Sequence, residues 1–246
     1  MSSPGPRITR PSAGGSKRPP AESLTLPEGA SIQVTPYEGP DQDPIIPRDG
    51  FLAAVALILA PVSAPSSPGS HPGEATSLEF LLIRRARHQA DPWSGHMALP
   101  GGRHDRADSS LLATAIRETR EEVGIDLERS GQLLGCLSVV APRNSALPPL
   151  TILPFVFRLT RPVTPQPASH EIAEALWAPL EVISHPQARS IHHHPVGEVH
   201  VAFPAFQVEG RTVWGLTHRI LKDFESRLGH ARMDQEDRRS VDGNRE

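Results

Sequence analysis

Short apolar runs separated by turn-forming residues dominate the hydrophobic pattern of the chain. The longest run, residues 51–62, is far shorter than the roughly 20 residues that a membrane-spanning helix requires, and we interpret residues 51–60 as a buried strand. The Pro-, Ser- and Gly-rich residues 61–76 predict a long hairpin loop, so residues 77–84 are expected to form the partner strand. Further strands are expected at residues 132–140, 151–159 and 199–207.

One segment shows helical spacing instead. Its apolar positions are Leu112, Ala115, Ile116, Thr119 and Val123. This spacing predicts a helix over about residues 109–124. Ser109 or Ser110 can cap its N-terminus through a side-chain oxygen, and Gly124 can end it in a left-handed conformation.

The two ends of the chain differ in composition from its middle. Residues 1–48 are dense in Pro and low in apolar residues, and residues 229–246 are charged and lack aromatic side chains. Such segments bury too little apolar surface to offset the entropy of ordering, so we expect a disordered Pro-rich arm and a disordered charged tail. Residues 49–228 are expected to form one domain with a mostly aliphatic core, because only 4% of the chain is aromatic.

Charge and cysteine content exclude several functional classes. The formal net charge of -3 gives no electrostatic basis for binding nucleic acid or an anionic membrane, and no secretory signal is visible. The single cysteine, Cys136, cannot form an intrachain disulfide, and its apolar neighbours favour a small core residue over a nucleophile. These features fit a cytoplasmic protein.

Three glutamates share one face of the predicted helix. Glu118, Glu121 and Glu122 stand at i, i+3 and i+4, so their carboxylates repel one another unless a positive group lies among them. Mg²⁺ or Mn²⁺ fits this role, because these hard cations prefer oxygen ligands and are commonly shared with substrate phosphates. The alternative is a solvated acidic face, and the Pro-Gly-Gly turn at residues 100–102 favours the metal site.

Two segments together resemble a known family. L-P-G-G at residues 99–102 and R-E-T-R-E-E-V-G at residues 117–124 resemble the Nudix box, G-x5-E-x7-R-E-U-x-E-E-x-G-U, in which U is a bulky apolar residue. The loop between them is one residue longer than the motif, and Ser109 occupies the position of its first glutamate. Asp108 or Asp105 can supply the missing carboxylate.

The longer loop, with its Asp-x-Ser sequence, is typical of the coenzyme A pyrophosphatase-like branch of the Nudix hydrolases. Residues 81–86 loosely resemble the start of that branch's upstream signature, whose arginine has its nearest counterpart in Arg87. Residues 171–180 resemble the family's strand that enters a short helix, and residues 212–221 resemble the closing helix of the branch. Thr119 departs from the motif, where a bulky apolar residue is typical.

The resemblance covers roughly residues 51–228 and implies a Nudix-type α/β/α sandwich, in which a mixed sheet lies between helices. The hydrophobic pattern alone predicts only a mixed α and β fold. The resemblance also implies hydrolysis of a nucleoside diphosphate linked to another group, X, with Mg²⁺ or Mn²⁺ as cofactor.

Specific roles follow from the matched positions. Glu118 and Glu122 are expected to bind the metal, and Glu121 to act as a further ligand or as the base that orients water. The carbonyl of Gly101 can add a ligand, because a Gly-Gly turn lets the backbone approach an ion closely. Arg117 is expected to orient the glutamates through charge-assisted hydrogen bonds.

Other side chains are candidates for binding substrate. They are Arg84, Arg85, Arg87, Trp93 and Gly102. The arginines can hold phosphate or carboxylate or can be merely solvated, and the tryptophan can stack on a base or pack the loop. Glu171 can serve as general base or extra metal ligand, with a surface salt bridge or helix cap as the alternative, so the identity of the base stays open. The histidines at residues 192–194 are expected in an exposed loop, because adjacent histidines point different ways and lack the constellation of a zinc site.

Three functions remain open at this point. The first is hydrolysis of the pyrophosphate bond of coenzyme A or acyl-CoA, and the second is the same reaction on ADP-ribose, NADH or another nucleotide. The third is a non-catalytic Nudix domain that binds a nucleotide or a protein. The expected partner is a small-molecule nucleotide, and a homodimer is also an expectation because dimers are frequent in the superfamily.

Overall fold

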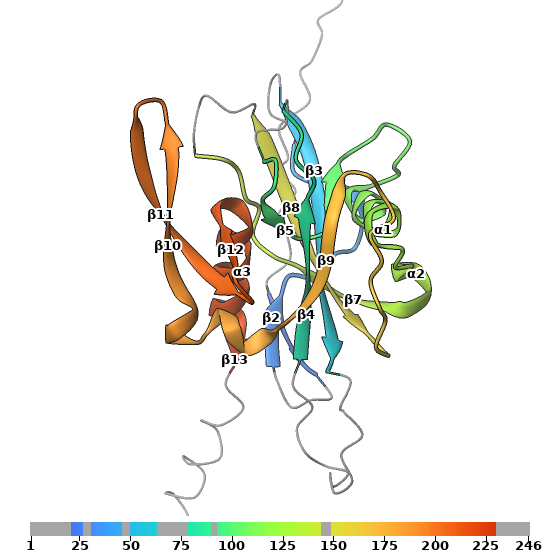
Figure 1. Cartoon of the computed structure of the whole chain (residues 1–246). Coiled ribbons are helices and arrows are strands. Elements are labelled where there is room, and N and C mark those ends of the chain that lie inside the picture. Colours follow the sequence, from blue (N-terminus) through green and yellow to red (C-terminus); the bar gives the residue numbers. More distant parts are fainter. Residues whose placement is uncertain are drawn as a thin grey trace, which may run out of the picture.

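The protein is described by a computed structural model over residues 21–26, 31–45, 50–62, 78–89, 93–143 and 149–229. Its centre is a mixed seven-stranded sheet (Figure 1). The strands of this sheet are β3 (Phe51–Pro61), β4 (Leu78–Arg85), β5 (Met97–Ala98), β6 (Gly101–Arg103), β7 (Gly131–Cys136), β8 (Leu150–Leu159) and β9 (Ile172–Pro179). Their order is β5-β4-β3-β8-β7, with β6 paired to β3 and β9 paired to β4.

Strand β3 lies at the centre of this sheet and is buried on both faces. It pairs in parallel with β8 and antiparallel with β4 and β6. Leu57 and Leu59 join one hydrophobic core, whereas Ala56 and Ile58 join another, because successive side chains of a strand point to opposite faces. Burial on both faces explains why this segment is a continuous apolar run rather than an alternating one.

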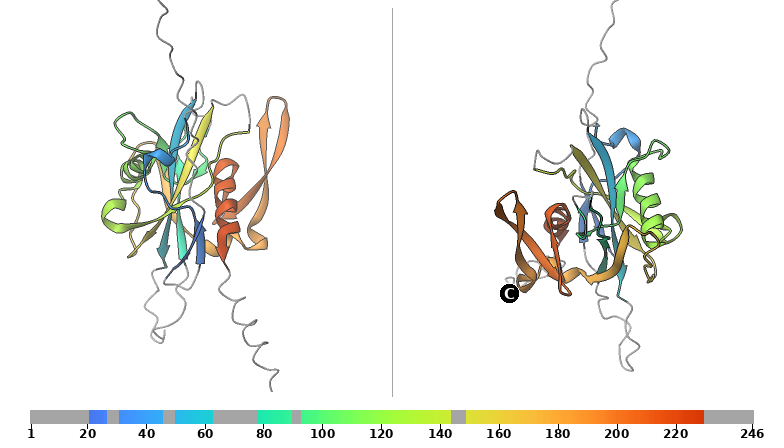
Figure 2. Two further views of the ribbon diagram at one scale, coloured as in Figure 1. Left: turned by 180° about the vertical axis from the view of Figure 1, so that it is seen from behind. Right: turned by 45° about the horizontal axis from the view of Figure 1, so that its top comes forward.

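Helices cover the two faces of the sheet (Figures 1 and 2). Helices α1 (Leu111–Val123) and α2 (Leu127–Ser130) lie on one face, and α3 (Gly215–Arg227) lies on the other. Beside α3 stands a three-stranded sheet of β10 (Arg189–Val196), β11 (Val199–Val208) and β12 (Arg211–Trp214). Short 3-10 turns, η2 (Leu180–Ile183) and η3 (Pro186–Ala188), connect β9 to this sheet. The predicted mixed-sheet sandwich is confirmed.

The N-terminal segment differs from its prediction as a disordered arm. Strands β1 (Glu22–Thr25) and β2 (Ser31–Val34) form a small sheet with β13 (Leu228–Gly229), and the turn η1 (Pro40–Gln42) follows. Ile32 and Val34 are completely buried. The disordered arm therefore does not include residues 22–26 and 31–45, while residues 1–20, 27–30 and the predicted tail at 230–246 lie outside the described residues.

Most expected elements agree with the structure within a few residues. The predicted partners β3 and β4 do pair, although most of their connecting loop, residues 63–77, lies outside the described part. The closing helix begins at Gly215, because the residues before it form β12. The histidines 192–194 lie in strand β10 rather than in a loop. No helix within the described ranges is long and apolar enough to cross a bilayer.

Candidate active site

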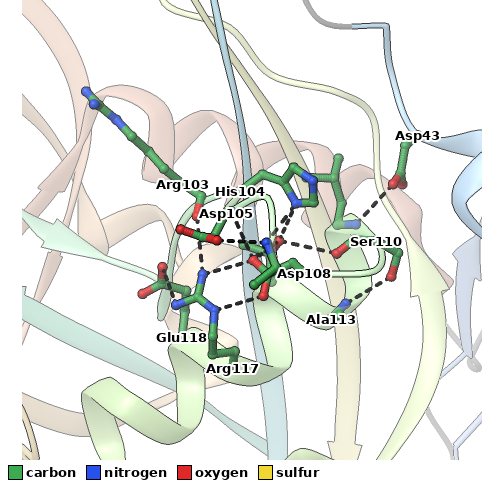
Figure 3. A network of polar contacts seen from close by, with 12 residues as sticks. Asp43, Arg103, His104, Asp105, Asp108, Ser110, Ala113, Arg117 and Glu118 are labelled. Carbon is green, nitrogen blue, oxygen red and sulfur yellow. Dashed lines mark hydrogen bonds and ion pairs between the residues drawn. The ribbon is translucent and has the colours of Figure 1, made fainter.

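Helix α1 presents the acidic residues, and its two ends are fixed by capping groups. Ser110 caps the N-terminus by accepting a hydrogen bond from the Ala113 N–H at 3.1 Å, and Gly124 ends the helix with φ 71°. Asp43, just after η1, also accepts a hydrogen bond from the Leu111 N–H at 3.0 Å (Figure 3). The N-terminal segment thus helps to hold the helix in place.

The Gly-Gly turn at the start of β6 lies against strand β3 and helix α1. Gly101 has φ +145°, and a Cβ at this residue would approach the carbonyl oxygen of Ala54 to 2.2 Å. A Cβ at Gly102 would lie 2.4 Å from Oε1 of Glu118. Residue 101 therefore needs glycine, whereas an added Cβ at residue 102 would displace the carboxylate of Glu118, which packs directly on the backbone.

Glu122 is the most buried of the helix carboxylates, with 4% of the residue exposed. Its Oε2 accepts a hydrogen bond from the Gly101 N–H at 2.8 Å. Burial raises its pKa to about 8, and the nearby charges of Glu118 and Glu171 act in the same direction. Burial also raises the pKa of Glu118, against the lowering effect of the neighbouring arginine. The site thus favours protons or cations at these two carboxylates.

Arg117 organises the acidic side chains through its planar guanidinium (Figure 3). Its Nε and Nη2 atoms donate to the two oxygens of Asp108 at 2.9 and 3.0 Å, and its Nη1 lies 3.0 Å from both Glu118 and Glu121. These hydrogen bonds hold the pKa of Asp108 down, to about 2. Of the two candidates for the missing carboxylate, Asp108 lies against Arg117, whereas Asp105 bonds only within its own loop.

The carboxylate oxygens fit a hard divalent cation. Within the described residues, Oε1 of Glu122 and Oε2 of Glu118 accept no hydrogen bond. An all-oxygen donor set of this kind suits Mg²⁺ or Mn²⁺. No three acidic, histidine or cysteine side chains of the described part are arranged around one point, so such an ion would take further ligands from water and substrate phosphate.

The predicted base candidates differ in their surroundings. The side chain of Glu121 is 54% exposed and reaches the acidic site only through its ion pair with Arg117. Glu171 comes before β9, and its charge raises the pKa of both Glu118 and Glu122. The structure therefore brings Glu171 near the acidic residues, although it lies far away in sequence.

The three arginines, which are close in sequence and were named as substrate-binding candidates, are divided between the faces of the sheet. Arg85 acts electrostatically on Glu122, on the α1 face. Arg84 instead donates to Glu174 at 3.1 Å and, together with Arg87, lines a cavity next to β10 and β12. Adjacent strand residues point to opposite faces, which explains the division. Their grouping as a single phosphate site is therefore not what the structure shows.

Trp93 was a predicted substrate-binding candidate, and Arg211 was not. Trp93 packs with Val55 and Leu216 against a small apolar cluster, so the packing alternative describes it. Arg211, which the sequence did not single out, donates to Glu174 beside Arg84. Only the pairing of β4 with β9 and the turn into β12 bring these residues together, so no local pattern could have identified them.

The chain is similar to several known proteins. The NUDIX domain model matches residues 73–197. An uncharacterized protein of Schizosaccharomyces pombe is 37% identical over 147 residues, which are 56% of this chain and 44% of the relative, so the chain spans less than half of that protein. An uncharacterized Nudix hydrolase, NudL, of Yersinia pestis is 28% identical over 193 residues, covering 77% of this chain and 88% of the relative. A MutT/nudix family protein from Enterococcus faecalis, of known crystal structure, is 19% identical with a TM-score of 0.47, covering 76% of this chain and 65% of the other.

Proposed function

Because this chain belongs to the Nudix hydrolase superfamily, we propose that it hydrolyses the pyrophosphate bond of coenzyme A or acyl-CoA. The products would be a phosphopantetheine and adenosine 3′,5′-bisphosphate. The contact between helix α1 and the Gly-Gly turn is the main support for catalysis. Glu122 accepts from the Gly101 N–H, and Glu118 lies where a Cβ of Gly102 would otherwise be.

Glu118 and Glu122 are the residues that would hold the divalent metal, each through a carboxylate oxygen that has no donor within the described residues. When bound, Mg²⁺ or Mn²⁺ neutralises the pyrophosphate and lowers the pKa of water. Arg117 keeps the Glu118 carboxylate in place, while Asp108 fixes the guanidinium from the other side with two hydrogen bonds. A fixed carboxylate pair loses little entropy when it binds a charged ligand.

Glu171 and Glu121 are the two candidates for the base that takes a proton from the attacking water. Glu171 is close enough to raise the pKa of both buried glutamates. Glu121 is exposed and already paired with Arg117, which turns it towards the guanidinium. We favour Glu171 as the base and Glu121 as a residue that positions Arg117.

The choice of coenzyme A rests on the sequence of the loop and the closing helix. The Asp-x-Ser loop contains Asp108, which makes the bidentate pair with Arg117, and the closing-helix segment forms β12 and α3. ADP-ribose, NADH or another nucleotide is the second candidate, because residues 81–86 match the upstream signature of the coenzyme A branch only loosely. Either substrate class uses the same acidic residues.

A substrate panel tests this proposal. Coenzyme A, ADP-ribose, NADH and diadenosine polyphosphates would be incubated separately with Mg²⁺, Mn²⁺ or EDTA. Cleavage of coenzyme A well above the others, abolished by EDTA, is expected. Preferred cleavage of another member would discard coenzyme A and keep the mechanism. Nucleotide binding without any cleavage would contradict catalysis and support the non-catalytic binding domain.

A further inference from the structure

The cavity lined by Arg84 and Arg87 lies on the opposite face of the central sheet from the acidic residues. Its volume is about 660 Å³, within the range of roughly 300–1,000 Å³ typical of small-molecule sites. Strand β4 separates the two places, because Arg84 lines the cavity and its neighbour Arg85 acts on Glu122. The small sheet β10-β11-β12, which lies away from α1 in Figure 1, supplies the far wall.

That far wall is aromatic. His192 and His194 lie two residues apart on β10 and therefore point to the same face, and both are partly buried, whereas His193 between them is exposed. The ring centroids of His192 and His194 lie 4.2 and 4.6 Å from that of Trp214 on β12. His96, from the loop before β5, approaches the same indole at 4.7 Å. Flat rings thus cover one side of the cavity.

These histidines are arranged as ring surfaces rather than as metal ligands. No group of three histidine, cysteine or acidic side chains within the described ranges can hold a metal ion. Burial and the neighbouring His194 and His193 lower the pKa of His192, which keeps its imidazole neutral near pH 7. A neutral imidazole against an indole offers a surface on which a heteroaromatic ring can stack.

The other side of the cavity is positively charged. Arg84, Arg87 and Arg211 line it, and no acidic residue among the described ones does. Glu174 binds Arg84 and Arg211 together, and Glu209 lies 3.6 Å from Arg211, so the excess of positive charge in the cavity lies at Arg87. Arg87 is exposed, and no ion pair of its side chain occurs within the described residues. Guanidinium groups arranged in this way suit a phosphate monoester.

We propose that this cavity binds a phosphorylated nucleoside, with the base against the His192–Trp214 wall and the phosphate at Arg87, Arg84 and Arg211. The ligand is either the nucleotide half of the substrate or a free nucleotide. Binding of the nucleotide half of the substrate rests on the proposed function, whereas binding of a free nucleotide does not depend on any hydrolysis. The cavity would then distinguish substrates by their nucleoside phosphate, away from the scissile bond.

Calorimetric titration of the full chain in EDTA tests the site without turnover. Adenosine 3′,5′-bisphosphate, adenosine and inorganic phosphate would be added to the wild type, to Arg87→Gln and to His192→Leu. We expect the bisphosphate to bind, and each substitution to weaken its binding about tenfold, the typical effect of losing one charge-assisted hydrogen bond or one ring contact. His193→Leu and Arg120→Gln, at exposed positions outside the cavity, are matched controls that should bind as the wild type does.

The outcomes separate this inference from the proposed function. No binding of the bisphosphate, or binding that neither Arg87→Gln nor His192→Leu weakens, would overturn the inference. Turnover measured with Mg²⁺ or Mn²⁺ then shows whether the natural ligand is the nucleotide half of the substrate or a free nucleotide. A KM raised about tenfold by His192→Leu with kcat unchanged assigns the site to the substrate, and an unchanged KM assigns it to a free nucleotide. A chain that binds the bisphosphate here but cleaves nothing would refute the proposed function and leave this site supported.

Discussion

The buried carboxyl of Glu122 makes the stability of the metal-free protein depend on pH. Its pKa is raised from 4.5 to about 8, so between these values the folded protein holds a proton that the unfolded chain has lost. Stability from this group is fully present below pH 4.5 and is lost as the pH rises through about 8. One pH unit corresponds to ~1.4 kcal/mol, so we expect a loss of about 2 kcal/mol between pH 6 and pH 8.

Urea unfolding in EDTA at pH 6 and pH 8 measures this loss. In Glu122→Gln the amide can still accept from the Gly101 N–H but cannot ionise, so the variant should lack the 2 kcal/mol decrease, to within about 0.5 kcal/mol. Glu121→Gln is the matched control, because the Glu121 side chain is 54% exposed and should leave the pH dependence as in the wild type. Adding Mn²⁺ at pH 8 should restore stability to the wild type but not to Glu122→Gln. Equal pH dependence in the wild type and Glu122→Gln would refute the reasoning, since it would mean that the carboxylate is charged and adequately solvated in the fold.

Three further predictions concern the supports of the site. Asp108→Asn should lower the free energy of unfolding at pH 7 by about 2 kcal/mol. This difference from the wild type should shrink as the pH falls from 4 towards 2, where the wild-type carboxylate gains its proton. A difference that stays the same at every pH in urea unfolding would contradict this. Gly102→Ala should displace the Glu118 carboxylate and weaken Mn²⁺ binding roughly 10- to 100-fold in calorimetry, and unchanged affinity would show that this contact is unimportant. Asp43→Ala removes the acceptor of the Leu111 N–H and should cost about 1 kcal/mol in thermal or urea unfolding; no loss would show that Ser110 suffices as the cap.

Local patterns were sufficient for the central features of the fold. The continuous apolar run of β3 is explained by burial on both faces, and the ends of α1 coincide with Ser110 and Gly124. Both the run and the caps act within a few residues of one another along the chain. The shared face of Glu118 and Glu122 was likewise accessible from helical spacing, whereas their contacts with the Gly-Gly turn, 21 residues from Glu122, were not.

Features that depend on pairing between segments far apart in the sequence could not be predicted from local patterns. Ile32 is buried because β2 pairs with β13 at Leu228, almost the whole folded chain away, whereas its own segment is rich in proline and polar residues. The division of Arg84 from Arg85 follows from the alternation of β4 and from the irregularity between these residues in its pairing with β9. The histidines of β10 acquire partners only because β11 and β12 fold back beside that strand.

The central claim is that Glu118 and Glu122 hold the metal that makes this chain a pyrophosphohydrolase. The most direct test is the rate of nucleotide release from a mixed pool of nucleoside diphosphate derivatives in Mg²⁺ or Mn²⁺, measured for the wild type and for Glu122→Gln with circular dichroism as a check of folding. We expect metal-dependent release by the wild type and at least about a hundredfold slower release by a fully folded Glu122→Gln. A folded Glu122→Gln variant that releases nucleotide as fast as the wild type would contradict the assignment.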